Sequence, residues 1–294
     1  MSGTDNSLTG PFARAHALIY GGAKGIGRAV AMEWAKRGAR LSIADLAEDA
    51  AKATAAEIIA AGGEAVALAA NVLSDESIAA TASAAENAFG PVDIVMNNVG
   101  GMLNGHPEDI PFAEWHRIMD INYFAAVRGC LHFLPKFLER GKGHVVNTAS
   151  FAGLYPYAAS RVPYGAAKAA IISMSENLAV YLEPKGIRVS CLMPGPVMTQ
   201  VMDSMTSWTE DCPMRGPGTE TKLLLPEQLA VVLADGMAQG WIFIPSDPVA
   251  FDIIVRHADD PDAFIRSKIA EFASGERGNP VIPDAVKAMI GAQA

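Results

Sequence analysis

Three residues in the second half of the chain have the types and spacing for acid–base chemistry on an alcohol: Ser150, Tyr164 and Lys168. Tyr164 and Lys168 are four residues apart, so in a helix their side chains share one face. A phenol has a pKa of about 10 and is a poor base at neutral pH. A nearby ammonium favours the phenolate, and a water-poor pocket strengthens the attraction. Such a tyrosine could move a proton on or off a hydroxyl group while Ser150 holds the same oxygen.

A lone Tyr-x-x-x-Lys pair on an alanine-rich helix often arises by chance, so the prediction depends on the elements around it. In the first half, a glycine-rich loop follows an apolar strand over 15–20 and precedes a helix over 28–39. Glycines let the backbone turn sharply and approach a pyrophosphate, and a helix start favours the anion. The loop residues expected to bind a nucleotide are Gly21, Lys24, Gly25, Ile26 and Gly27.

An acidic residue at the end of the next strand predicts which nucleotide is bound. Asp45 closes a strand over 40–45, about 20 residues past the glycines, where the ribose of an adenosine lies. A carboxylate accepts a hydrogen bond from a 2′-hydroxyl and repels a 2′-phosphate, which favours NAD. Lys24 in the loop could meet a phosphate, which leaves NADP as the alternative. The other interpretation of Asp45 is a solvated strand end.

Strands and helices alternate along the whole chain, which predicts an α/β fold. Further strands are expected at 64–72, 92–101, 144–150, 187–193 and 241–248, separated by helices, including one long helix over 114–141. This order predicts a doubly wound, Rossmann-type parallel sheet with helices on both faces. Ligands then bind at the carboxyl ends of the strands. Residues at these ends join the predicted nucleotide site: Asn71, Val72, Asn98 and Gly100.

These motifs together resemble the short-chain dehydrogenase/reductase family. The matching pieces, in order, are Gly21-x-x-x-Gly25-x-Gly27, Asn97-Asn98-x-Gly100, Asn122, Ser150, Tyr164-x-x-x-Lys168 and Pro194-Gly195-Pro196-Val197-Met198-Thr199. The resemblance covers residues 15–200 approximately and implies a catalytic set of Ser150, Tyr164, Lys168 and Asn122. It implies that Asn122 helps hold a water joining the lysine to solvent. It also adds Pro194, Gly195, Val197 and Thr199 to the cofactor site, together with Tyr164 and Lys168.

The expected function is an NAD(H)-dependent interconversion of a secondary alcohol and a ketone. Tyr164 takes the hydroxyl proton, Lys168 lowers the pKa of the tyrosine and contacts the nicotinamide ribose, and Ser150 binds the substrate oxygen. Two alternatives remain open: an NADPH-dependent ketoreductase, and a catalytically silent NAD-binding regulatory protein. The presence of all four catalytic residues argues against the second.

Two stretches outside these motifs predict how the substrate is covered. Residues 197–225 are too long for an ordinary connection and are expected to form a lid. Val201, Met202, Met205, Trp208 and Met214 suggest an apolar wall for a bulky, apolar or aromatic substrate. A C-terminal extension over 245–294 contains three helical pieces. Residues 15–294 are expected to form one domain, preceded by a flexible tail over 1–14.

Composition excludes several classes of function. The formal net charge of −9 argues against binding to nucleic acid or an anionic membrane. No apolar stretch approaches the length of a membrane span. The three cysteines are scattered, which argues against a disulfide framework or a metal site and fits the cytoplasm. The resemblance implies a homodimer or homotetramer.

Overall fold

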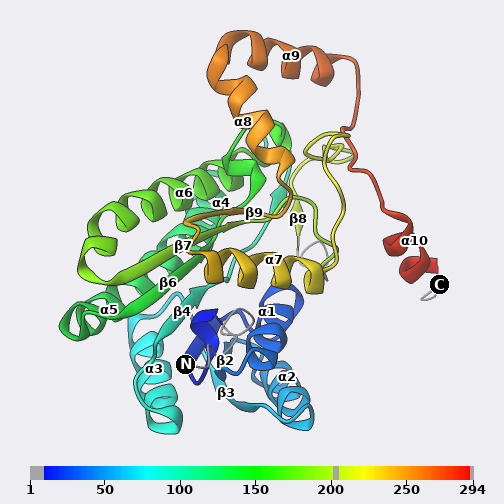
Figure 1. Cartoon of the computed structure of the whole chain (residues 1–294). Coiled ribbons are helices and arrows are strands. Elements are labelled where there is room, and N and C mark those ends of the chain that lie inside the picture. The colour runs from blue at the N-terminus through cyan, green and yellow to red at the C-terminus, as the bar shows by residue number, and fades with distance from the viewer. Residues whose placement is uncertain (1–9, 201–204, 292–294) are drawn as a thin grey trace, which may run out of the picture.

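The chain folds around a seven-stranded parallel sheet with helices on both faces (Figure 1). The computed structural model describes residues 10–200 and 205–291. The strands of this sheet, in chain order, are β1 (His16–Tyr20), β2 (Arg40–Asp45), β3 (Glu64–Ala69), β4 (Ile94–Asn97), β6 (Gly143–Thr148), β7 (Ile187–Met193) and β9 (Phe243–Pro245). Their order in the sheet is β3-β2-β1-β4-β6-β7-β9. Two short strands, β5 (Leu103–Asn104) and β8 (Thr206–Ser207), form a separate pair.

The helices come between the strands and after them. They are α1 (Gly25–Lys36), α2 (Glu48–Ala60), α3 (Asp75–Phe89), α4 (Phe112–Met119), α5 (Ala125–Arg140), α6 (Val162–Leu182), α7 (Pro226–Gln239), α8 (Val249–Asp259), α9 (Pro261–Ala273) and α10 (Asp284–Gly291). Figure 1 shows α8 and α9 at the end of the molecule opposite to α2 and α3.

Every residue of β1 is buried because both faces of the sheet are covered. Successive side chains of a strand point to opposite faces. Ala17 and Ile19 pack into the core shared with α1, α2 and α7, whereas Leu18 and Tyr20 pack into the core shared with α3, α5 and α6. The predicted doubly wound fold is thus confirmed. Because helices cover both faces of the sheet, the strand sequences are continuously apolar.

The point where the chain changes direction in the sheet lies between β1 and β4. From β1 the chain moves outward through β2 and β3, and from β4 it moves the other way through β6, β7 and β9. The loops that leave β1 and β4 therefore diverge, which opens a crevice at their carboxyl ends. This is where the predicted loop residues and Asn98 lie.

Part of the expected flexible tail is packed against the domain. Residues 10–12 form a short 3₁₀ turn, and the Phe12 side chain is fully buried. Its ring centroid lies 5.5 Å from that of Trp34, and the Arg37 guanidinium lies over the ring at 5.9 Å. Burying a phenylalanine is worth about 1.5–3 kcal/mol, enough to hold this short segment. The domain therefore begins before Ala15, and residues 1–9 of the expected tail lie outside the described residues.

The helix predicted over 114–141 is interrupted. A five-residue π-helical turn, Asp120–Phe124, separates α4 from α5. Asn122 lies in this turn, and its amide donates to the carbonyl oxygens of Ile118 at 3.0 Å and Gly101 at 2.9 Å. Such π turns are rare and occur often at functional sites. The interruption is a feature that the periodicity of the sequence does not show.

Candidate active site

One cleft of about 750 Å³ runs along the carboxyl ends of the strands, and it brings together residues that are far apart in the sequence. It is lined by all the predicted site residues except Gly27: Gly21, Lys24, Gly25, Ile26, Asp45, Asn71, Val72, Asn98, Gly100, Asn122, Ser150, Tyr164, Lys168, Pro194, Gly195, Val197 and Thr199. Gly27 is buried directly beneath the loop. One cleft thus contains both the predicted nucleotide site and the predicted acid–base residues.

The glycine loop requires glycine at its first and last motif positions. Gly21 has a φ of +77°, a backbone conformation that side chains rarely adopt. A Cβ added at Gly27 would lie 1.9 Å from the Gly21 carbonyl oxygen. The two glycines therefore let the first turn of α1 approach the end of β1. The amino end of α1 then faces the cleft, where its free N–H groups favour an anion.

Asp45 is held in place by two backbone N–H groups at the end of β2. Ala23 donates to one carboxylate oxygen at 3.2 Å, and Ala47 donates to the other at 3.0 Å. The carboxylate lines the cleft beside the glycine loop. Its position is therefore fixed before any ligand arrives, and it presents a negative charge at the far end of the cleft from Tyr164. Lys24, at the start of α1, is exposed and lines the same end.

The side chain of Asn98, after β4, forms hydrogen bonds with residues at the ends of β1 and β6. Its amide nitrogen donates to the Gly21 carbonyl at 3.0 Å, and its amide oxygen accepts from the Thr148 hydroxyl at 3.1 Å. These bonds join the loops after β1 and β4 to the last residue of β6. Thr148, which the sequence analysis did not select, therefore helps to fix the geometry of the whole cleft floor.

Asn122 and Gly100 lie against Lys168. A Cβ at Gly100 would lie 2.7 Å from the Asn122 side-chain oxygen and 3.3 Å from the Lys168 nitrogen. Only a glycine lets the loop after β4 pass this close to both side chains. The Asn122 oxygen also accepts from the Gly101 N–H at 3.3 Å. The π turn thus places an amide where the loop after β4 meets the lysine.

Lys168 is almost completely buried and donates to the Thr148 carbonyl at 2.9 Å. Burial disfavours the ammonium and lowers the pKa of Lys168 to about 8, despite a small opposing effect of Cys191. Its nitrogen lies 5.7 Å from the centre of the Tyr164 ring. The lysine therefore lies on the same helix face as the tyrosine, as the spacing predicts.

The pKa of Tyr164 is raised above its usual value because burial disfavours the phenolate. Two groups oppose this effect: the Ser150 hydroxyl and the charge of the Arg161 guanidinium both lower the pKa. The sequence predicts that Lys168 supplies part of this lowering. In the structure the Lys168 ammonium instead donates to the Thr148 carbonyl at 2.9 Å.

Arg161 and Tyr157 are two further cleft residues that sequence reasoning missed. Both line the cleft, and the Arg161 guanidinium lies 5.8 Å from the centre of the Tyr157 ring. The Ser150 hydroxyl lies near both Tyr157 and Tyr164 and lowers the pKa of each, although burial dominates and raises both. One signal was available: Arg161 comes immediately before the helix that carries Tyr164, so it lies within one turn of the tyrosine.

The expected apolar wall of the substrate end is only partly present. Met214 lines the cleft, whereas Met205 and Trp208 do not, because β8 pairs with β5 and directs this stretch away. Val201 and Met202 lie outside the described residues. The wall comes instead from two arginines and their neighbours: Met102, Tyr157, Arg161, Met214, Arg215, Gly216 and Pro217.

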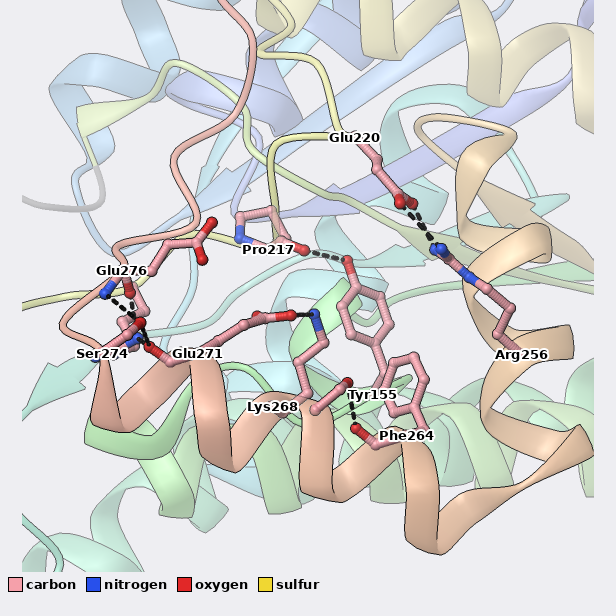
Figure 2. Close-up of polar contacts among 11 residues, drawn as sticks. Tyr155, Pro217, Glu220, Arg256, Phe264, Lys268, Glu271, Ser274 and Glu276 are labelled. Carbon is pink, nitrogen blue, oxygen red and sulfur yellow. Dashed lines mark hydrogen bonds and ion pairs between the residues drawn. The ribbon is translucent and has the colours of Figure 1, made fainter.

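The C-terminal helices hold this wall in place (Figure 2). The Tyr155 hydroxyl donates to the Pro217 carbonyl at 3.0 Å, and Glu220 forms an ion pair with Arg256 of α8. The Arg215 guanidinium donates to carbonyls at the end of α9, including that of Phe272 at 2.6 Å. The C-terminal extension therefore holds residues 215–220 against the cleft. We call these residues the cover segment.

Two kinds of site are not found in the described part of the chain. Residues 10–200 and 205–291 contain no group of three or more His, Cys, Asp or Glu side chains arranged to hold a metal ion. Nor do those residues include a helix with the length and apolarity needed to cross a membrane.

Comparison with known proteins decides the family. A family model of short chain dehydrogenases matches residues 15–210. The chain belongs to the short-chain dehydrogenase/reductase family. The family predicted from the motifs is thus confirmed, and with it the expectation of a dehydrogenase or reductase that acts on a hydroxyl group.

Individual relatives cover most of this short-chain dehydrogenase/reductase. The 2,5-dichloro-2,5-cyclohexadiene-1,4-diol dehydrogenase of Sphingobium indicum is 34% identical over 203 residues, 67% of this chain and 81% of that protein. The 1-deoxy-11-beta-hydroxypentalenate dehydrogenase of Streptomyces exfoliatus is 30% identical over 254 residues, 83% of this chain and 90% of that one. A crystal structure of a Burkholderia phymatum family member in complex with NAD has a TM-score of 0.75 and 27% identity, and covers 86% of this chain and 95% of its own.

Proposed function

We propose that this enzyme interconverts a secondary alcohol and a ketone with NAD(H), using Ser150, Tyr164, Lys168 and Asn122 as its catalytic set. One observation carries the proposal: a single cleft joins the glycine loop and Asp45 to these four side chains. A nucleotide bound at the loop end would extend along the strand ends toward Tyr164. The nicotinamide ring, when bound, accepts or gives the hydride.

In the oxidation direction, Tyr164 acts as the base that takes the proton of the substrate hydroxyl. Ser150 and Tyr164 line the same cleft, and the Ser150 hydroxyl lowers the pKa of the phenol, so Ser150 is placed to donate a hydrogen bond to the same substrate oxygen. Lys168 supplies positive charge on the buried side of the phenol. Asn122, fixed by the π turn, lies where it connects Lys168 to the loop after β4. In reduction, Tyr164 returns the proton to the ketone oxygen.

The residues present fit NAD as the cofactor. The space left by the missing Cβ of Gly27 lets α1 approach the loop, as a pyrophosphate site requires. The fixed Asp45 carboxylate suits two ribose hydroxyls and repels a phosphate at the 2′ position. Lys24 lines the same region and is the one observation that favours NADP. Asp45 has the stronger influence on cofactor choice because two backbone N–H groups hold it in place, whereas Lys24 extends from an exposed position.

Asp45→Ala tests the cofactor assignment. We expect the variant to bind NADPH about 5- to 30-fold more tightly than the wild type, because a charge repulsion of about 1–2 kcal/mol is removed. NADH affinity should fall at the same time. The measurement is a fluorescence titration with each reduced cofactor, with Asp49→Ala on the exposed face of α2 as the matched control. An unchanged ratio of the two affinities would contradict the role of Asp45.

The substrate is proposed to be a bulky alcohol with its hydroxyl on a ring. The dehydrogenase of Sphingobium indicum acts, by its name, on a cyclohexadiene diol, and Tyr164 lines a cleft of about 750 Å³. A spectrophotometric screen at about 340 nm with NAD and NADP against cyclic, aliphatic and aryl alcohols tests this. NADH formation with ring alcohols supports it. Tight NADH binding with no alcohol oxidised would instead favour a regulatory protein.

We also propose a homodimer or homotetramer that works in the cytoplasm. Apolar side chains remain exposed on neighbouring helices, including Leu131 and Leu138 on α5 and Val180 and Tyr181 on α6. Faces of this kind often pair between subunits. The three free cysteines suit a reducing compartment. Light scattering of the purified protein tests the assembly, and a monomeric mass at micromolar concentration would contradict it.

A further inference from the structure

Arg161 is a buried cation in the substrate half of the cleft. Only 7% of the residue is exposed. It ends a short 3₁₀ turn and precedes the first residue of α6, Val162. Arginine is almost never this buried unless it is paired, because removing a charge from water costs several kcal/mol. The contacts of its guanidinium therefore show whether the charge is neutralised within the protein or is available to a ligand.

Those partners do not neutralise it. One terminal nitrogen donates to the Arg215 carbonyl at 2.5 Å, and the guanidinium lies near the face of the Tyr157 ring. The Nε–H group is buried and has no hydrogen-bond partner. None of the ion pairs found among residues 10–200 and 205–291 includes Arg161. The folded protein thus keeps a positive charge with an unused donor beside the cleft.

The position of Arg161 is also held rigidly. The Arg215 carbonyl that it contacts belongs to the cover segment, and the Arg215 side chain is itself bound to the carbonyls at the end of α9. The C-terminal extension therefore fixes the acceptor that orients Arg161. A guanidinium held in this way is preorganised for a planar anion, because its donors match the two oxygens of a carboxylate.

Arg161 is close to the reacting group. Its charge lowers the pKa of the Tyr164 phenol, and both side chains line the cleft with Ser150. An anion bound to Arg161 would therefore belong to the same molecule whose hydroxyl meets Tyr164. The apolar neighbours Met102 and Met214 leave the rest of that molecule in an apolar environment.

We propose that the substrate is a cyclic hydroxy acid or keto acid, and that Arg161 binds its carboxylate. The inference rests on the proposed alcohol–ketone chemistry and narrows its substrate class. It replaces the wholly apolar or aromatic substrate expected from the sequence with an apolar ring body that carries one negative charge. The relative from Streptomyces exfoliatus has, by its name, a substrate with both a hydroxyl and an acid group.

The first test is a binding experiment that needs no turnover. The probes are cyclohexanecarboxylate and its methyl ester, titrated by calorimetry into the NADH-loaded enzyme. We expect the wild type to prefer the acid, and Arg161→Gln to lose about 10- to 100-fold in affinity for the acid, so that the preference disappears. Arg161→Lys should recover part of the preference for the acid over the ester. Arg266→Gln, which removes an exposed arginine on α9, is the matched control and should keep it.

The outcomes separate this inference from the proposed function. Equal binding of acid and ester by the wild type would overturn the carboxylate assignment, as would an acid preference that survives in a folded Arg161→Gln. Folding is checked by NADH binding and thermal melting. In the activity screen, turnover of ring alcohols without preference for those bearing a carboxylate would overturn the inference and leave the function standing. Acid-selective binding in an enzyme that oxidises no alcohol would support the role of Arg161 and count against the function.

Discussion

Replacing Lys168 by methionine should make the protein more stable while it removes the activity. Lys168 is almost fully buried, and within the described part of the chain its ammonium donates to one acceptor, the Thr148 carbonyl. Methionine has a similar length and no charge, so it fills the same space without the cost of burying an ion. A gain in stability from the loss of a catalytic group is expected where a site holds an unfavourable charge.

The size of the effect follows from the pKa. Burial lowers the pKa of Lys168 from its ordinary value of 10.5 to about 8, and one pH unit corresponds to about 1.4 kcal/mol. Folding the protonated lysine therefore costs about 3 kcal/mol. The variant also loses the bond to Thr148, worth about 1 kcal/mol. The net gain near neutral pH is about 2 kcal/mol, or about 4 °C in Tm for a chain of this size.

The pH dependence gives the sharper assay. Below pH 8 the lysine is protonated in both the folded and the unfolded chain, so the full cost is present. Between pH 8 and 10.5 the unfolded chain binds more protons than the folded one, so the stability of the wild type rises relative to the variant. Above this window the advantage of the variant is gone. The other titrating groups are common to both proteins and cancel in the difference.

Urea unfolding of the wild type and Lys168→Met at several pH values between 7 and 10.5 measures this difference. Lys36→Met, at an exposed position in the last turn of α1, controls for the loss of a charge and should show no such dependence. A variant less stable than the wild type at pH 7, or a stability difference that does not change with pH, would refute the reasoning.

Two further predictions concern the glycine loop and the pH profile of the reaction. Gly27→Ala should weaken NADH binding by about tenfold or more, because its Cβ would lie 1.9 Å from the Gly21 carbonyl oxygen and overpacking costs about 1–3 kcal/mol. Fluorescence titration measures the NADH affinity. An unchanged affinity would show that the loop does not bind the cofactor. Arg161→Gln should move the ascending limb of kcat/KM for alcohol oxidation to higher pH, because the Arg161 charge lowers the pKa of Tyr164. A limb that stays in place or moves to lower pH would contradict the effect of the Arg161 charge on the group that titrates in this limb.

Much of the fold could be predicted because its signals are local. The apolar strands, the glycine turns and the helix starts each depend on a few neighbouring residues, and their alternation determines the sheet. The strand ends that carry Asp45 and Asn98 followed from the same pattern, since all parallel strands end at one edge.

The features that sequence reasoning missed depend on contacts between distant segments. Phe12 is buried because Trp34 and the residues around it provide a pocket for its ring. The π turn at Asn122 depends on the Gly101 carbonyl, which comes from another loop. The polarity of the substrate end depends on Arg161, whose isolation from any carboxylate becomes visible only when the C-terminal extension is in place. No periodicity in the sequence encodes these contacts.

The most direct test of the account compares Tyr164 and Tyr157, two cleft tyrosines whose pKa values are both lowered by the Ser150 hydroxyl. Oxidation of a ring alcohol by NAD is followed for the wild type, Tyr164→Phe and Tyr157→Phe, and NADH affinity is measured for each. The account predicts that Tyr164→Phe binds NADH like the wild type and loses at least about 100-fold in kcat, while Tyr157→Phe keeps measurable turnover. Substantial turnover by Tyr164→Phe would contradict the central claim that this phenol moves the substrate proton.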